Sequence, residues 1–123
     1  MALHKFTDIT LDVLSYTDTT GLMTGRNTNN EIVFELQYNS KLFNVVSNDK
    51  VELIIGVNVD DDELESSSDY AIVAAVAQTN WRDNPPHFII SSGGMIGRFY
   101  LERKDIESII DVGNDCRVYF KRL

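Results

Sequence analysis

Apolar and polar residues alternate with a period of two along most of this chain, and two is the period of a β-strand. Helical spacing is almost absent. The alternation predicts eight strands, which lie around 9–13, 22–25, 32–38, 51–59, 70–78, 88–90, 95–101 and 116–120. Strands of this number and spacing predict an all-β protein, an eight-stranded antiparallel barrel that is closed or nearly closed, with a sandwich as the alternative.

Turn residues and one or two short helical turns separate the predicted strands. The sequence Asp83-Asn84-Pro85-Pro86 breaks the strand pattern, because proline has no N–H for a ladder. The sequence Ser91-Ser92-Gly93-Gly94 predicts the turn of a hairpin. Ser40 is placed to cap a single helical turn over 41–43, and isoleucines three and four residues apart predict a short helix over 104–110.

Two segments are less regular than the rest. Residues 70–78 are apolar at nearly every position, which favours a strand buried on both faces, although the four alanines there also suit a helix. Residues 60–68 are acidic and polar with no alternation. This second segment predicts a mobile acidic loop between the two halves of the chain.

Length and composition fit one domain over residues 1–123, with hydrophobic residues at 43% and charged residues at 24%. The net charge of −8 disfavours autonomous binding of nucleic acid, since phosphate contacts need clustered Lys and Arg. Several basic residues lie in the C-terminal part and weaken that exclusion without reversing it. They are Arg98, Arg103, Lys104, Arg117, Lys121 and Arg122.

The single cysteine, Cys116, excludes an intrachain disulfide and favours a reduced, intracellular setting. The longest apolar run, 71–77, is far shorter than the ~20 residues of a membrane span. The first residues contain no apolar stretch of signal-peptide length. We expect a soluble protein of the cytoplasm or nucleus, with no membrane partner.

Sequence patterns of catalytic and metal sites are not found. His4, His87 and Cys116 lie far apart, and the acidic run at 60–65 lacks the glycine and ligand spacing of an EF-hand. No serine lies in a nucleophile elbow, and the glycines at 93–97 lack the Gly-Lys-Ser/Thr of a phosphate loop. We expect no catalytic residue, no cofactor and no metal. A small enzyme or ligand-binding barrel is a third possibility, for which the sequence offers no convergent polar cluster.

Three aromatic residues and one arginine are candidate contact residues. Trp81, Tyr100 and Tyr119 are either platforms on which the bases of a single strand stack or ordinary core and rim aromatics. Arg98 lies among apolar residues, on the strand face opposite Phe99. There it is either an anchor for the carboxylate of a partner protein or an ordinary surface arginine.

Four segments, taken in order and spacing, match a pattern found in one family. They are Lys5-Phe6-Thr7-Asp8-Ile9, Asp69-Tyr70-Ala71-Ile72-Val73, Gly93-Gly94-Met95-Ile96-Gly97-Arg98-Phe99 and Asp115-Cys116-Arg117-Val118-Tyr119-Phe120. Together they resemble the eighth subunit of DNA-directed RNA polymerase, the small subunit shared by the three eukaryotic nuclear polymerases. The most specific piece is the Gly-Gly-apolar-apolar-x-Arg-apolar element. The chain differs at Ser92, where the family usually carries an aromatic residue, and at Ala74-Ala75, where it carries an aromatic-glycine step.

The resemblance implies an eight-stranded antiparallel barrel of the oligonucleotide/oligosaccharide-binding type, made of two similar halves. It also implies a non-catalytic assembly subunit in the nucleus, which docks on the largest polymerase subunit without sequence-specific contact to nucleic acid. A single-stranded nucleic-acid-binding barrel is the alternative function. Carried over to this chain, the candidate partner-binding residues are Gly93, Gly94, Met95, Ile96 and Arg98.

Overall fold

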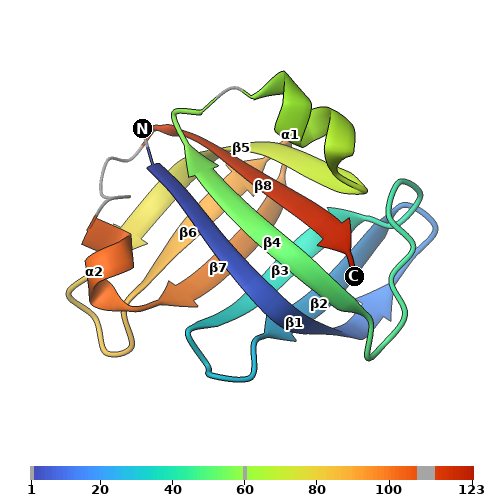
Figure 1. Ribbon diagram of the computed structural model, residues 1–123, viewed down its shortest axis with the longest axis horizontal. Helices are drawn as coiled ribbons and strands as arrows, with labels where there is room; N and C mark the ends of the chain where they lie inside the picture. Colours follow the sequence, from blue (N-terminus) through green and yellow to red (C-terminus); the bar gives the residue numbers. More distant parts are fainter. Residues whose placement is uncertain (1, 60, 108–112) are drawn as a thin grey trace.

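The computed structural model describes residues 2–59, 61–107 and 113–123, and these form a closed barrel of eight antiparallel strands (Figure 1). This confirms the predicted all-β barrel over the sandwich. Two short helices, α1 (Asp62–Ser67) and α2 (Arg103–Ile106), lie outside the strand ladder. The strands are β1 (Ala2–Tyr16), β2 (Thr20–Arg26), β3 (Ile32–Asn39), β4 (Lys50–Val57), β5 (Tyr70–Asn80), β6 (His87–Ser92), β7 (Met95–Leu101) and β8 (Asp115–Arg122).

The barrel consists of two halves with the same topology. Around the barrel the strands follow the order β1-β2-β3-β7-β6-β5-β8-β4, and β4 closes onto β1. Within each half, three hairpin-connected strands are followed by a fourth that returns beside the first, giving the orders 4-1-2-3 and 8-5-6-7 of a Greek key. The halves join antiparallel at the equivalent pairs β3–β7 and β4–β8.

One hydrophobic core fills the barrel and takes residues from all eight strands. Aromatic rings at its centre bridge the two halves: Phe34 on β3 stacks on Phe99 of β7 with ring centroids 5.4 Å apart, and Phe99 stacks on Phe88 at 5.3 Å. Two glycines on β2 make room for such rings. A Cβ on Gly25 would stand 2.3 Å from the ring of its cross-strand partner Phe34, so no larger residue fits there without a shift.

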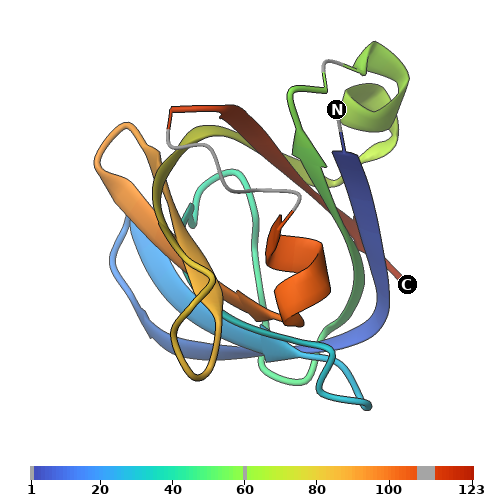
Figure 2. The same cartoon turned by 90° about the vertical axis from the view of Figure 1, so that its left-hand side faces the viewer.

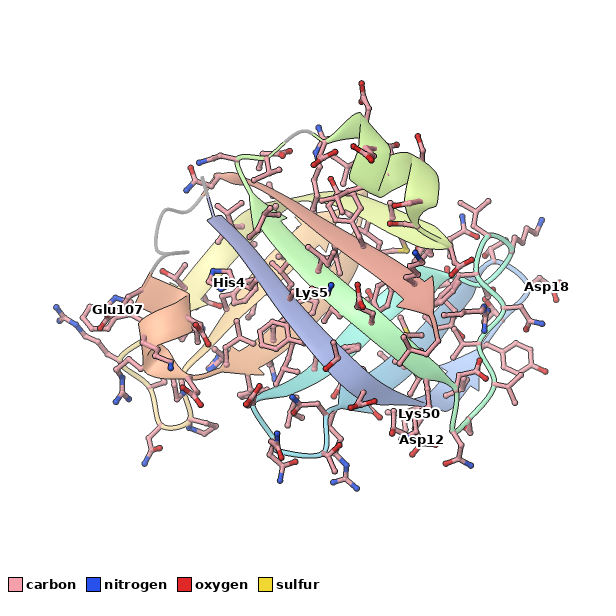
Figure 3. The ribbon with its side chains drawn as sticks, viewed as in Figure 1. His4, Lys5, Asp12, Asp18, Lys50 and Glu107 are labelled. Carbon is pink, nitrogen blue, oxygen red and sulfur yellow. The ribbon has the colours of Figure 1, made fainter. Side chains whose placement is uncertain are left out.

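The strand directions place different connections at the two ends of the barrel. The β1–β2 turn, the β3–β4 connection and the β6–β7 turn lie at one end, where Figure 3 labels Asp18. The β2–β3 loop, the β5–β6 loop and α2 lie at the other, near the labelled Glu107. Ile106 of α2 is fully buried, and the helix sits over the barrel mouth in Figure 2.

β1 is longer than the predicted 9–13 because it pairs with both of its neighbours. Its first part pairs with β4 and its last part with β2, and the register with β4 shifts between Phe6 and Ile9. Asp8 has φ +55° at that shift, so the strand bends there. A second shift, between Val13 and Ser15, leaves Leu14 as an extra residue.

Two predictions about the middle of the chain are wrong. The strand at 70–78 was expected to be buried on both faces, but only Tyr70, Ile72, Ala74 and Val76 point inward, and the intervening side chains face out. The segment at 60–68 was expected to be a loop, but Asp62–Ser67 form α1. The side chain of Asp61 accepts hydrogen bonds from the N–H groups of Glu63 and Leu64, which is the capping interaction that starts a helix.

The predictions for the remaining helical turns need smaller corrections. Residues 40–42 form a turn, as expected, but Asn39 caps it in place of Ser40: its side chain accepts from the N–H groups of Lys41 and Leu42. The helix expected over 104–110 corresponds to α2, which spans Arg103–Ile106. Its predicted positions 108–110 lie outside the described residues.

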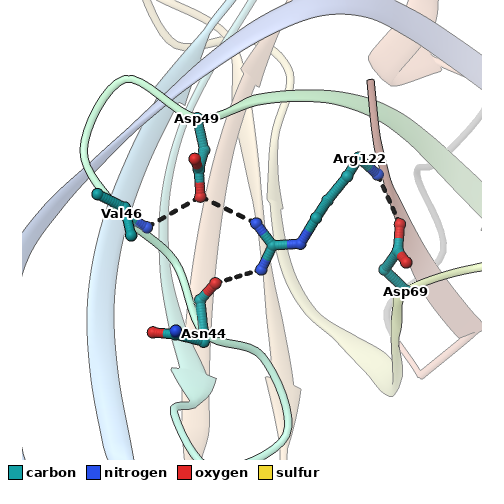
Figure 4. Close-up of polar contacts among 5 residues, drawn as sticks. All are labelled: Asn44, Val46, Asp49, Asp69 and Arg122. Atoms are coloured by element: carbon teal, nitrogen blue, oxygen red, sulfur yellow. Dashed lines mark hydrogen bonds and ion pairs between the residues drawn. The ribbon is translucent and has the colours of Figure 1, made fainter.

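Arg122, at the end of β8, ties three parts of the chain together (Figure 4). Its guanidinium donates to the Asp49 carboxylate at 2.9 Å and to the backbone carbonyl of Asn44. Its backbone N–H donates to the Asp69 carboxylate at 2.6 Å. These contacts hold the β3–β4 connection against the end of the barrel.

Candidate functional site

The β6–β7 hairpin carries the residues singled out by the resemblance. Ser92 pairs with Met95, so Gly93 and Gly94 form a two-residue turn with φ +55° and +89°. Two successive positive φ values give a type I′ turn, whose twist matches that of the strands and which favours glycine at both positions. A Cβ at either glycine would meet nothing within 4 Å, so the tip of the hairpin projects into open space.

β7 alternates between core and surface as the sequence predicted. Gly97, Phe99 and Leu101 point inward and are buried. Ile96 is 45% exposed and Arg98 is exposed, on the face opposite Phe99. The backbone N–H of Ile96 donates to the Gln37 side chain at 2.8 Å, which fixes the start of β7 against β3.

Arg98 is the only charged Lys, Arg, Asp or Glu residue on β5, β6 and β7. It stands opposite Glu35 on β3 and Ile89 on β6. Its side chain makes no hydrogen bond or ion pair with any residue that the structure describes. The uncharged outward residues next to it are Ile89 on β6 and Ile96 and Tyr100 on β7. Arg98 therefore lies on an outer wall without Lys, Arg, Asp or Glu along β5 and β6, with Glu35 opposite it on β3.

Several other cations of the barrel pair with or donate to groups within the chain. Arg122 pairs with Asp49 at 2.9 Å, Lys5 with Glu52 at 3.4 Å and Lys104 with Glu102 at 3.3 Å. Arg117 pairs with Asp115 at 3.1 Å. The guanidinium of Arg103 donates to the backbone carbonyls of Trp81 and Asp83. These pairings leave Arg98 in a different electrostatic situation from its neighbours.

The three candidate aromatic residues do not form one platform. Trp81 is partly buried against the core, and the guanidinium carbon of Arg82 lies 4.7 Å from the centroid of its ring. The ring of Tyr100 lies 5.0 Å from that of His87. Tyr119 is only 2% exposed, near α1, and this burial raises the pKa of its phenol. For Tyr119 and Trp81 the interpretation as core or rim aromatics agrees best with this packing.

The histidines and the cysteine lie apart from one another. Cys116 is fully buried on β8, where desolvation raises the pKa of its thiol to about 12, so the thiol is protonated at neutral pH. His87 contacts the Asn80 amide at 3.0 Å, and His4 lies 3.8 Å from Asp105. Among residues 2–59, 61–107 and 113–123, no three His, Cys, Asp or Glu side chains gather to hold a metal ion. Neither described helix is long and apolar enough to cross a membrane.

An open cleft of about 650 Å³ lies at the barrel end that carries α2, and no sequence pattern predicts it. The β2–β3 loop, the β5–β6 loop and the end of β7 surround it. Its walls are mostly apolar, with Val33, Pro86 and Tyr100 among them, and Glu31 and Glu102 lie at its margin. The loops that form this cleft are distant in sequence. The alternation of residues along a single strand does not indicate which loops lie side by side, so it does not predict the cleft.

No protein-family model matches this chain, and no curated protein matches it. Within the described part of the chain, the β6–β7 hairpin combines an open glycine turn with exposed apolar and cationic side chains. All five candidate residues, Gly93, Gly94, Met95, Ile96 and Arg98, lie together on this hairpin. Gly93 and Gly94 shape it, Ile96 and Arg98 face solvent, and Met95 is half-buried.

Proposed function

We propose that this protein is a non-catalytic structural subunit of a nuclear DNA-directed RNA polymerase, docked on the largest subunit through the β6–β7 hairpin. The observation that carries the proposal is the exposed pair of an apolar and a cationic side chain, Ile96 and Arg98, on a hairpin that has no other Lys, Arg, Asp or Glu. Such a surface suits a protein partner. Interfaces take most of their affinity from a few buried apolar and arginine anchors.

The topology supports the same proposal. The resemblance implied a barrel of two similar halves related to the oligonucleotide/oligosaccharide-binding fold, and the two Greek keys of this chain meet at equivalent strand pairs. A closed barrel leaves no sheet edge for a partner strand to extend. Docking therefore takes place through side chains on the outer wall and through the hairpin tip.

Arg98 gives the interface its polar anchor. An exposed arginine that makes no hydrogen bond or ion pair with the described residues can donate two parallel hydrogen bonds to one carboxylate of a partner, and charge-assisted bonds of this kind are stronger than neutral ones. The whole chain carries a net charge of −8, so a basic partner surface is attracted at long range while the single cation fixes the local register.

The test is a pull-down of the tagged protein from nuclear extract at moderate salt, with partners identified by mass. Changing Arg98→Glu should leave the barrel folded and lower recovery of the largest polymerase subunit by at least about 30-fold, the loss typical of a hot-spot residue. The matched control is Arg26→Glu, which reverses an exposed arginine on β2, away from the hairpin. Equal recovery with the Arg98 variant would remove this residue from the interface.

The same experiment separates the proposal from nucleic-acid binding. If the wild-type protein recovers no polymerase subunit but shifts single-stranded DNA or RNA in a gel, with strong salt dependence, the barrel is a single-strand binder. The ion pairs at Arg117, Arg122, Lys5 and Lys104 and the net charge of −8 count against that result.

A further inference from the structure

An uncharged stripe of side chains crosses the outer wall of the barrel and includes Ile96. Figure 1 shows β1, β4 and β8 in front, with the other strands forming a wall behind them. Along this wall, strand pairing and hydrogen bonds bring residues of neighbouring strands near one another; on β5, Ala75 pairs with Ser91, and Val73 is the next residue along the same outward face. From β5 to β1 the residues are Val73, Ser91 and Ser92, Ile96, Gln37, Leu22, and Leu14 with Ser15.

Hydrogen bonds and register connect the members of this stripe directly. The Ser92 hydroxyl donates to the Val73 carbonyl at 2.7 Å, and Ser91 is the cross-strand partner of Ile96. The Gln37 side chain accepts from the Ile96 N–H at 2.8 Å, and Gln37 pairs with Leu22 on β2.

At its far end the stripe reaches β1. Leu22 pairs with Ser15, and Leu14 is the extra residue in the bulge next to it. The stripe therefore continues from the second half of the barrel onto the first without a break.

The stripe has charge only at its margins. None of its residues is charged, although charged residues make up 24% of the chain. Arg98 and Glu35 face one another on one side of it, and the ion pair between Arg117 and Asp115 closes its β8 end. Three of its residues, Leu14, Val73 and Ile96, are large apolar side chains exposed by 57%, 52% and 45%.

We infer that this stripe is the binding track for one extended, uncharged segment of the polymerase's largest subunit, with a carboxylate at its margin that meets Arg98. This inference rests on the proposed function and extends it from the hairpin to both halves of the barrel. The wall of a barrel is curved, so an extended peptide segment can follow it more closely than a flat surface of a partner protein can. Adjacent strands lie about 4.8 Å apart, so six strands span about 24 Å, the length of roughly seven extended residues.

The absence of charge along the stripe selects the occupant. A nucleic-acid strand laid across it would leave its phosphates without Lys or Arg partners, and phosphate contacts supply most of the affinity of single-strand binders. A partner segment with apolar and uncharged side chains, by contrast, buries Leu14, Val73 and Ile96 without desolvating an unpaired charge.

A photo-crosslinking amino acid at each of four positions tests this track in nuclear extract, with crosslinked peptides identified by mass. Ile96 tests the hairpin, and Leu14 and Val73 test the two ends of the stripe. Leu3 is the control, since it is a leucine on the same strand as Leu14 and is 54% exposed against 57%. We expect Leu14, Ile96 and Val73 to crosslink one continuous segment of the largest subunit, and Leu3 not to crosslink it.

The alternative outcomes separate the two proposals. Crosslinks to the largest subunit from Ile96 alone, or equally from Leu3, would overturn the track and leave the proposed function standing. Crosslinks to nucleic acid, or no polymerase peptide from any position, would overturn both. In solution, Leu14→Glu and Val73→Glu should each weaken association about tenfold, while Leu3→Glu should leave it unchanged.

Discussion

At some positions of this barrel, the residue type is determined by the side chain directly opposite on the neighbouring strand. Gly25 on β2 faces Phe34 on β3, and the aromatic ring lies over the glycine where a side chain would be. Gly21 has the same relation to Tyr38, with the Tyr38 ring 2.4 Å from the position of a Cβ. These pairs let large rings reach the centre of the barrel, where Phe34 continues to Phe99 in the other half.

Replacing Gly25 by alanine should therefore destabilise the fold through overpacking. We expect Gly25→Ala to lower the free energy of unfolding by about 1–3 kcal/mol, because the rigid Phe34 ring must shift within a packed core. Urea unfolding followed by the fluorescence of Trp81 measures this. Phe34→Leu is destabilising alone, but combined with Gly25→Ala it should cost less than the sum of the two, since the smaller side chain vacates the space. If the two losses in the free energy of unfolding were additive, the Phe34 ring would not be the reason why position 25 requires glycine.

At the scale of elements, alternation predicted the strands, but it did not predict which faces of β5 are buried. The apolar run at 70–78 suggested burial on both faces, yet alanines at 71, 75 and 77 are small enough to stand on the outer wall, and the sequence cannot separate that role from a core role. α1 was missed because its six residues contain no buried side chain and thus no helical stripe. The outward position of Arg98 was predictable, since the period of two along β7 determines it.

The β3–β4 connection is the element most dependent on one side chain. Arg122→Ala removes the guanidinium that contacts Asp49 and Asn44 and lies 4.7 Å from the centre of the Phe43 ring. We expect a loss of about 1–2 kcal/mol in the free energy of unfolding, since hydrogen bonds to charged groups are stronger than neutral ones but this pair is partly exposed. Hydrogen exchange should also become faster at the amide of Val46, while the strands stay protected.

The matched control for this connection is Arg26→Ala, which removes an exposed arginine outside the network. Its effect on unfolding should stay within about 0.5 kcal/mol, as for most surface substitutions. If exchange at residues 44–49 were the same in the Arg122 variant as in the wild type, other contacts would hold the connection and the role assigned to Arg122 would be wrong.

At the scale of the whole molecule, the pairing of the two halves is the feature that strand patterns leave open. Alternation predicts eight strands, but the contacts β3–β7 and β4–β8 join residues 59 to 71 positions apart in the chain, and no local signal specifies them. The uncharged stripe depends on the same register, because the β3–β7 pair brings Ile96 next to Gln37, which in turn pairs with Leu22 on β2. The sequence therefore predicts the positions of the hairpin residues, but it does not predict that they share a surface with Leu14.

This architecture predicts that neither half is stable by itself. The ring of Phe34 stacks on that of Phe99 across the boundary between halves, and Phe99 stacks on Phe88, so either Greek key alone would expose one face of the common core. We expect a fragment of residues 1–59 and a fragment of residues 62–123 each to lack cooperative unfolding, and an equimolar mixture to recover the near-ultraviolet circular dichroism of the intact chain. The break falls beside α1, outside the strand ladder.

The control is the intact chain cut by a protease at an inserted site in the same connection, which should stay folded because both halves remain together at high effective concentration. A fragment of residues 1–59 that unfolds cooperatively alone would mean that each Greek key holds a core of its own. The two halves would then be two separate domains that pack against each other. The stripe crosses their boundary between Ile96 and Gln37, so in that case the stripe would form only when the two domains are packed together.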